Sequence, residues 1–144
     1  MPSAGSCHCQ LVTITVDFPE HPRPHLCNCS MCAMKAMVAI DVPMDALVVT
    51  GGEDFLSLYK FNAGVAEHYF CSNCGIHMFQ RLRSDPSRYG VNGACFDGLG
   101  RFDFDEMPIH DGGSAHPKDT GQPTRVAGSA RYDPQISGDT SLRT

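Results

Sequence analysis

The segment Phe70-Cys71-Ser72-Asn73-Cys74-Gly75 places two cysteines three residues apart, directly before a glycine. In a C-x-x-C-G turn the two thiolates converge, backbone N–H groups point at the sulfurs, and the glycine supplies a permissive backbone. The residues on either side, 67–70 and 76–82, read as strands. The pattern therefore predicts a metal-binding knuckle between two strands.

Such a knuckle supplies only two of the four ligands that a structural zinc needs. The pair Cys7 and Cys9 is a good candidate for the other two, because residues i and i+2 of an extended segment project to the same face. A redox C-x-x-C would need a thioredoxin-like βαβ context, which the sequence lacks. We therefore expect a structural zinc that ties the N-terminal strand to the middle of the chain, held by Cys7, Cys9, Cys71 and Cys74.

A third cluster, Cys27-Asn28-Cys29-Ser30-Met31-Cys32, offers three thiolates within six residues. Three protein ligands leave one position for water or substrate, which is the arrangement of a catalytic zinc. Sulfur ligands favour zinc over magnesium or calcium, and an iron–sulfur cluster is the alternative. We expect a catalytic zinc on Cys27, Cys29 and Cys32, which makes two zinc ions per chain.

The eighth cysteine, Cys95, stands alone between Ala94 and Phe96. Two interpretations stay open for it. It could complete a second four-cysteine site together with the middle cluster. It could instead be a small buried hydrophobic residue on a strand.

Composition limits the class of protein. The chain has 144 residues, enough for one domain, and a net charge of -5, which does not suit nucleic-acid binding. No stretch approaches the roughly 18 apolar residues of a membrane span, and the start, MPSAGSCHCQ, is not a secretory signal. We expect a cytoplasmic protein whose thiols stay reduced, which favours metal sites over disulfides.

Short alternating segments dominate the rest of the chain. In residues 11–18, Val12, Ile14, Val16 and Phe18 share one face. No segment keeps a helical period over twelve residues, so the fold class is mostly β, and residues after about Asp111 read as an irregular tail. Further strands are expected at 36–42, 47–50, 55–61 and 89–96.

The order of four motifs resembles the glutathione-dependent formaldehyde-activating enzyme family, also called the CENP-V/GFA family. The motifs are G-S-C-H-C-Q (5–10), C-N-C-S-M-C (27–32), Y-K-F (59–61) and F-C-S-N-C-G (70–75). The resemblance covers residues 3–118 and leaves 119–144 as a polar tail. It implies a β-tent of antiparallel sheets held by zinc sites, with a structural zinc on the first and last clusters and a catalytic zinc on the middle one.

The resemblance also implies a carbon–sulfur lyase that acts on an adduct of a glutathione-like thiol and a formaldehyde-like aldehyde. These small molecules are the expected partners, and a homodimer is a further option. The competing hypothesis is a non-enzymatic binding module with two structural zinc sites, which would need Cys95 or a histidine to close the middle cluster.

Other side chains are candidates for supporting roles. A base that moves the proton could be His77, His68 or Asp97. A glutathione-like ligand carries two carboxylates, which basic side chains bind. The candidates are Lys35, Arg81, Arg83 and Arg88, although Arg81 and Arg83 also fit the solvated face of a strand.

Overall fold

The computed structural model describes residues 2–135, and their strands form three sheets. The largest sheet has five antiparallel strands in the order β4-β9-β8-β7-β6. Their bounds are β4 (Ala39–Pro43), β6 (Leu56–Tyr59), β7 (Glu67–Cys71), β8 (His77–Arg81) and β9 (Arg88–Asn92).

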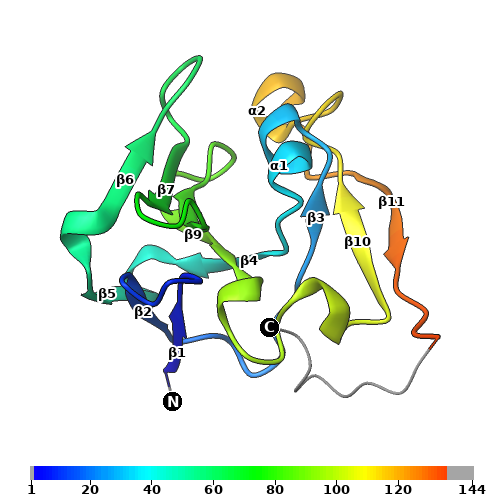
Figure 1. Cartoon of the computed structure of the whole chain (residues 1–144). Helices are drawn as coiled ribbons and strands as arrows, with labels where there is room; N and C mark the ends of the chain where they lie inside the picture. The colour runs from blue at the N-terminus through cyan, green and yellow to red at the C-terminus, as the bar shows by residue number, and fades with distance from the viewer. Residues whose placement is uncertain (1, 136–144) are drawn as a thin grey trace.

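A second sheet is antiparallel and joins β1 (Ser3–Ser6), β2 (Thr13–Val16) and β5 (Leu47–Gly51). The third sheet places β10 (Glu106–His110) between β11 (Val126–Arg131) and β3 (Leu26–Cys27). Its short β10–β3 pair is parallel. Figure 1 shows this third sheet beside the five-stranded sheet, with helix α1 (Ser30–Lys35) and helix α2 (Pro117–Thr120) at one end of it.

The alternating segment around β2 builds the centre of the core. Val12, Ile14 and Val16 are 0% exposed, as their shared face predicts. They pack in one cluster with buried side chains from the five-stranded sheet, including Met78 and Val91. The mostly-β fold class with antiparallel sheets is therefore confirmed.

The predicted strand at 89–96 is shorter than its sequence pattern suggests. The segment 89–96 leaves the sheet at Asn92, whose side chain accepts a hydrogen bond from the Ala94 N–H at 3.1 Å and starts a 3-10 turn over Gly93–Cys95. At Gly93 a Cβ atom would lie 2.2 Å from the Leu99 carbonyl oxygen, so the turn packs too closely for any other residue.

Most of residues 111–135 is irregular, as expected, yet α2 and β11 are regular elements within that segment. β11 forms because β10 offers it an antiparallel partner, which a sequence pattern of small and polar residues does not reveal. Residues 136–144 of the expected tail lie outside the described residues. Neither described helix has the length and apolar character needed to cross a membrane.

Candidate metal centres and active site

The first and last cysteine groups come together as one four-thiol cluster. The Sγ atoms of Cys7, Cys9, Cys71 and Cys74 all lie within 4.8 Å of one another. The Cys7–Cys9 and Cys9–Cys71 distances are 3.6 and 3.7 Å. A tetrahedral zinc with Zn–S bonds of about 2.3 Å has S···S edges of about 3.8 Å. The cluster therefore fits a closed tetrahedral metal ion, and we call it the closed cluster.

Two turns with matching backbone hydrogen bonds build the closed cluster. The Cys7 N–H donates to the Val12 carbonyl at 3.1 Å, and the Cys71 N–H donates to the Ile76 carbonyl at 2.9 Å. Gly75, with φ of 78°, supplies the left-handed backbone that the second turn needs. Each turn leads directly into a core strand, β2 or β8. A metal ion in the closed cluster would therefore join the two main sheets.

The middle cysteines form a second group, which we call the open cluster. The Sγ atoms of Cys27, Cys29 and Cys32 lie within 4.8 Å of one another. Cys27 ends β3, and Cys29 caps α1, where its Sγ accepts a hydrogen bond from the Cys32 N–H at 3.4 Å. Hydrogen bonds from the thiols of Cys27 and Cys32 lower the pKa of Cys29 to about 2. The local fold thus holds a thiolate at Cys29.

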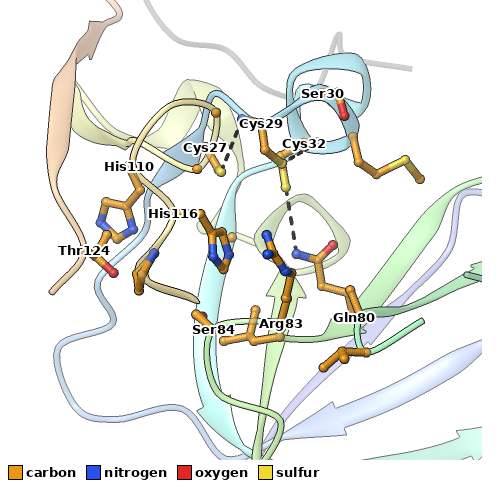
Figure 2. Close-up of a pocket in the computed structure, with 18 of the residues that line it drawn as sticks. Cys27, Cys29, Ser30, Cys32, Gln80, Arg83, Ser84, His110, His116 and Thr124 are labelled. Atoms are coloured by element: carbon orange, nitrogen blue, oxygen red, sulfur yellow. Dashed lines mark hydrogen bonds between the residues drawn. The ribbon is translucent and has the colours of Figure 1, made fainter. Parts of the chain in front are cut away.

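The open cluster lines a cavity of about 560 Å³. Figure 2 shows its cysteines on one side of the cavity, with His116 and Arg83 facing them, and a dashed line joins Gln80 to Cys32. Within residues 2–135, no fourth cysteine, histidine or carboxylate places a ligand atom within 4.8 Å of all three sulfurs. The arrangement therefore offers three protein ligands beside a space that a small molecule can enter.

Sequence reasoning missed a glycine that packs against the open cluster. A Cβ atom at Gly112 would lie 2.6 Å from the Cys27 sulfur. The backbone of the loop after β10 therefore packs directly against this thiol, with no room for a side chain. Asp111 anchors this loop, because its buried carboxylate accepts hydrogen bonds from Ser114 and Arg125. These hydrogen bonds hold the pKa of Asp111 well below its usual range. The residues lie in the expected tail, where the sequence carries no such signal.

Three histidines of the cavity wall also escaped the sequence analysis. The rings of His25 and His110 stack with their centroids 3.9 Å apart, and His116 lines the cavity nearby. Burial lowers the pKa of each of the three, so they are neutral at pH 7. The parallel pairing of β10 with β3 sets His110 opposite Cys27, a neighbour that sequence separation conceals.

The two candidate histidines, His68 and His77, share a network with Lys35. The Lys35 Nζ lies 2.7 Å from His68 Nδ1 and 3.4 Å from His77 Nε2, and it donates to Gln80 Oε1 at 2.8 Å. Burial lowers the pKa of His68, and it lowers that of His77 to about 2. Of the four side chains, His68 and Gln80 line the cavity.

The candidate arginines have different surroundings. Arg83 lines the cavity and pairs with Asp119. Arg81 pairs with Glu67 at 2.8 Å, and Arg88 donates to the Asp41 carbonyl at 3.1 Å. The structure therefore brings only Arg83 of these three to the cavity wall.

Cys95 belongs to neither cluster. Its thiol donates to the His77 carbonyl at 3.7 Å, and burial raises its pKa to about 12. Together with Asp97 it lines a separate surface notch beside β1. All eight cysteines are free of disulfide bonds. The structure therefore supports the interpretation of Cys95 as a packed thiol and places Asp97 in a different pocket from the open cluster.

Comparison with known families and structures gives consistent matches. The profile of the family described as "Glutathione-dependent formaldehyde-activating enzyme" matches residues 2–108. A crystal structure of a Rhodobacter sphaeroides protein is 36% identical, with a TM-score of 0.70, over 74% of this chain and 98% of that one.

Curated relatives carry the name "Putative glutathione-dependent formaldehyde-activating enzyme". The protein of Podospora anserina is 31% identical over 56% of this chain and 38% of its own length. That of Penicillium rubens is 32% identical over 60% of this chain and 47% of its own length. The matched region thus spans less than half of these curated relatives.

Proposed function

The chain belongs to the glutathione-dependent formaldehyde-activating enzyme family, and from this premise we propose that it is a zinc-dependent enzyme of the carbon–sulfur lyase type. Its substrates are a glutathione-like thiol and a formaldehyde-like aldehyde, or the adduct of the two. In the synthetic direction the thiol loses its proton, sulfur bonds to the carbonyl carbon, and the carbonyl oxygen takes up a proton. The lyase direction reverses these steps.

The proposed division of labour assigns one zinc ion to each cluster. Cys7, Cys9, Cys71 and Cys74 would hold a structural ion, and Cys27, Cys29 and Cys32 would hold a catalytic one. Thiol-only donor sets favour zinc over hard cations. A zinc ion in the open cluster supplies Lewis acidity, which lowers the pKa of a thiol that binds to it.

The cavity and two of the side chains that line it, His116 and Arg83, have further roles in the proposed reaction. The cavity confines both substrates beside the open cluster, and such confinement replaces a bimolecular encounter with an oriented one. His116 lines this cavity as a neutral imidazole whose Nδ1 accepts a hydrogen bond from the Lys118 N–H, so its Nε2 carries the proton and can donate a hydrogen bond to the carbonyl oxygen. Arg83, on the same wall, carries a charge suited to a substrate carboxylate.

One observation carries the proposal: the open cluster has three cysteines beside a cavity, whereas the closed cluster has four in the core. A binding module with two structural zinc sites would need a fourth protein ligand at the open cluster. Cys95, the candidate for that role, instead contacts His77 and Met78. An exchangeable position therefore favours an enzyme over a structural module.

The proposal extends to partners and compartment. Its proposed partners are small molecules, and neither nucleic acid nor a membrane is among them. The net charge of -5 agrees with the absence of nucleic-acid binding. Seven metal-binding thiols must stay reduced to function, which suits the cytoplasm. A homodimer stays a prediction that sedimentation of the purified protein checks.

The test is a screen of thiol and aldehyde pairs with the zinc-loaded protein and with its Cys29→Ser variant. Thiols and aldehydes also combine without a catalyst, so only a rate above that of the matched variant counts. We expect the variant to keep its fold and its closed-cluster zinc while its rate falls to the uncatalysed background. Equal rates for the two proteins, with glutathione and formaldehyde among the pairs, would contradict the proposed function.

A further inference from the structure

Lys35 is a cation that the fold surrounds with neutral groups. It lies in the last turn of α1, three residues after Cys32 and on the same side of the helix. Its three N–H donors face three acceptors, which are His68 Nδ1, His77 Nε2 and Gln80 Oε1. Within the described residues no carboxylate forms an ion pair with it. A partly buried ammonium without an anion is costly, so its compensating charge must lie elsewhere.

Gln80 links this cation to the open cluster. Its Oε1 accepts from Lys35 at 2.8 Å, and its Nε2 donates to the Cys32 sulfur at 3.9 Å (Figure 2). Because the lysine must face the amide oxygen, the amide nitrogen is directed at the sulfur. Gln80 is only 8% exposed, so solvent screens this path weakly. Burial lowers the pKa of Lys35 to about 8, and the sulfurs of Cys32 and Cys29 oppose this shift, because as thiolates they favour the charged ammonium.

The net charge of the open cluster affects which fourth ligand it can accept. Three thiolates and a divalent ion sum to -1, and the Lys35 ammonium brings the open cluster to neutrality. A further thiolate would restore a net charge of only -1. Without the lysine, the same thiolate would have to join a cluster that is already anionic, which is electrostatically unfavourable in a partly buried site.

We propose that Lys35 is a positioning residue of the open cluster, which acts through Gln80 and compensates the cysteine charge so that the cluster accepts an anionic sulfur ligand. This inference rests on the proposed function, since it assumes an exchangeable fourth position. It also gives a lysine near the cysteine motif a role other than contact with a substrate carboxylate.

The test measures ligand entry rather than turnover. The protein is loaded with cobalt(II), and its visible bands are followed during titration with 2-mercaptoethanol or with imidazole. The first ligand binds as a thiolate and releases its proton to the buffer, whereas the second binds neutral. Neither carries a carboxylate, so a direct contact between lysine and carboxylate cannot affect the result.

Lys35→Met is the main variant, and Lys60→Met is its control, because it removes the same charge from an exposed position. Lys35→Met should raise the Kd of 2-mercaptoethanol about 10- to 100-fold and change that of imidazole less than about 2-fold. Gln80→Glu keeps the lysine but places a carboxylate against it, so it should reproduce the selective loss even if Lys35→Met folds poorly.

The outcomes separate this inference from the proposed function. Equal losses for both ligands would assign Lys35 a merely structural role, and unchanged affinities in both variants would also overturn the inference. If the wild-type cobalt protein takes up neither ligand, the open position itself is absent and the proposed function fails first. If it binds imidazole but no thiol, the proposed function fails while the site stays exchangeable.

Discussion

The closed and open clusters both use cysteine sulfur as the ligand atom, and strand β8 connects them. β8 begins just after the knuckle of the closed cluster and carries Gln80 to the open cluster. The closed cluster has four sulfurs, and Cys71 is 0% exposed. The open cluster has three sulfurs on a cavity wall. The proposed structural and catalytic roles of the two clusters would therefore be separated by ligand count and access alone.

The local backbone explains the difference in access. The closed cluster is built by two turns that point toward each other from two sheets, so its ligands close around a central point. The open cluster comes from one segment, in which the end of β3 and the first turn of α1 supply all three sulfurs. A single segment covers only one side of an ion, which leaves the other side to a ligand.

The largest expected effect is on the closed cluster. Cys71→Ser removes one of its four ligands in the core. Structural zinc contributes roughly 10–16 kcal/mol in small zinc domains, which exceeds the usual net stability of about 5–15 kcal/mol. We therefore expect an unfolded protein at 25 °C, seen by circular dichroism and by zinc content.

The matched variant for Cys71→Ser is Cys29→Ser in the open cluster. It should retain the folded spectrum and one zinc ion per chain, because the closed cluster stays intact. If Cys29→Ser unfolds the protein as completely as Cys71→Ser does, the two clusters do not divide structural from chemical roles.

A smaller effect is expected from Gly112→Ala. The added Cβ would lie 2.6 Å from the Cys27 sulfur, so either the loop or the sulfur must shift. We expect the metal affinity of the open cluster to fall about 10- to 100-fold, while the closed cluster keeps its ion. Competition with a chromophoric chelator measures both affinities in one titration.

Gly128→Ala is the control for this substitution, because its added Cβ would lie an ordinary 3.8 Å from the Ile109 side chain on β10. It should leave both metal affinities unchanged. Normal metal binding by Gly112→Ala would mean that the loop after β10 does not constrain the open cluster.

These residues mark what sequence could and could not predict. The pairs Cys7/Cys9 and Cys71/Cys74 and the group Cys27 to Cys32 each follow from local spacing. The first two pairs could be joined because a structural zinc needs four ligands. The structure brings both groups together. The core face of β2 follows from strict alternation.

The surroundings of the open cluster were not predictable, since they depend on which distant segments pair. Gly112 and His110 reach the cysteines only because β10 pairs with β3, and that pair is too short to leave a pattern. Likewise, Lys35 meets His68 and His77 only because β7 and β8 are adjacent in the sheet facing α1. The spacing of cysteines in the sequence predicts which of them bind a metal together. It does not predict which distant residues form the wall of the cavity beside them.

His77, the first residue of β8, should make the stability of the fold sensitive to acid. Burial lowers the pKa of His77 to about 2, against about 6.5 when unfolded. The folded state therefore binds fewer protons than the unfolded state below pH 6.5, and stability falls as pH drops. Between pH 7 and pH 5 we expect His77 to contribute about 1–2 kcal/mol of this loss.

Urea unfolding of the wild type and of His77→Gln at the two pH values measures this contribution. Gln keeps an acceptor for Lys35 but does not titrate, so the variant should lose less stability on acidification. An identical loss in both proteins would place the acid-sensitive group elsewhere, for example in the thiolates of the clusters.

The smallest effect should come from Cys95→Ala, which tests whether the two clusters are separate. The substitution removes a buried thiol that contacts His77 and Met78, so a stability loss of about 1 kcal/mol is expected from lost packing and one weak hydrogen bond. The zinc content should not change, since neither cluster includes this sulfur. Loss of one zinc ion would make Cys95 a ligand and turn the open cluster into a second closed one. An unchanged content, measured beside Cys29→Ser, leaves the open cluster with three cysteines and a position for substrate.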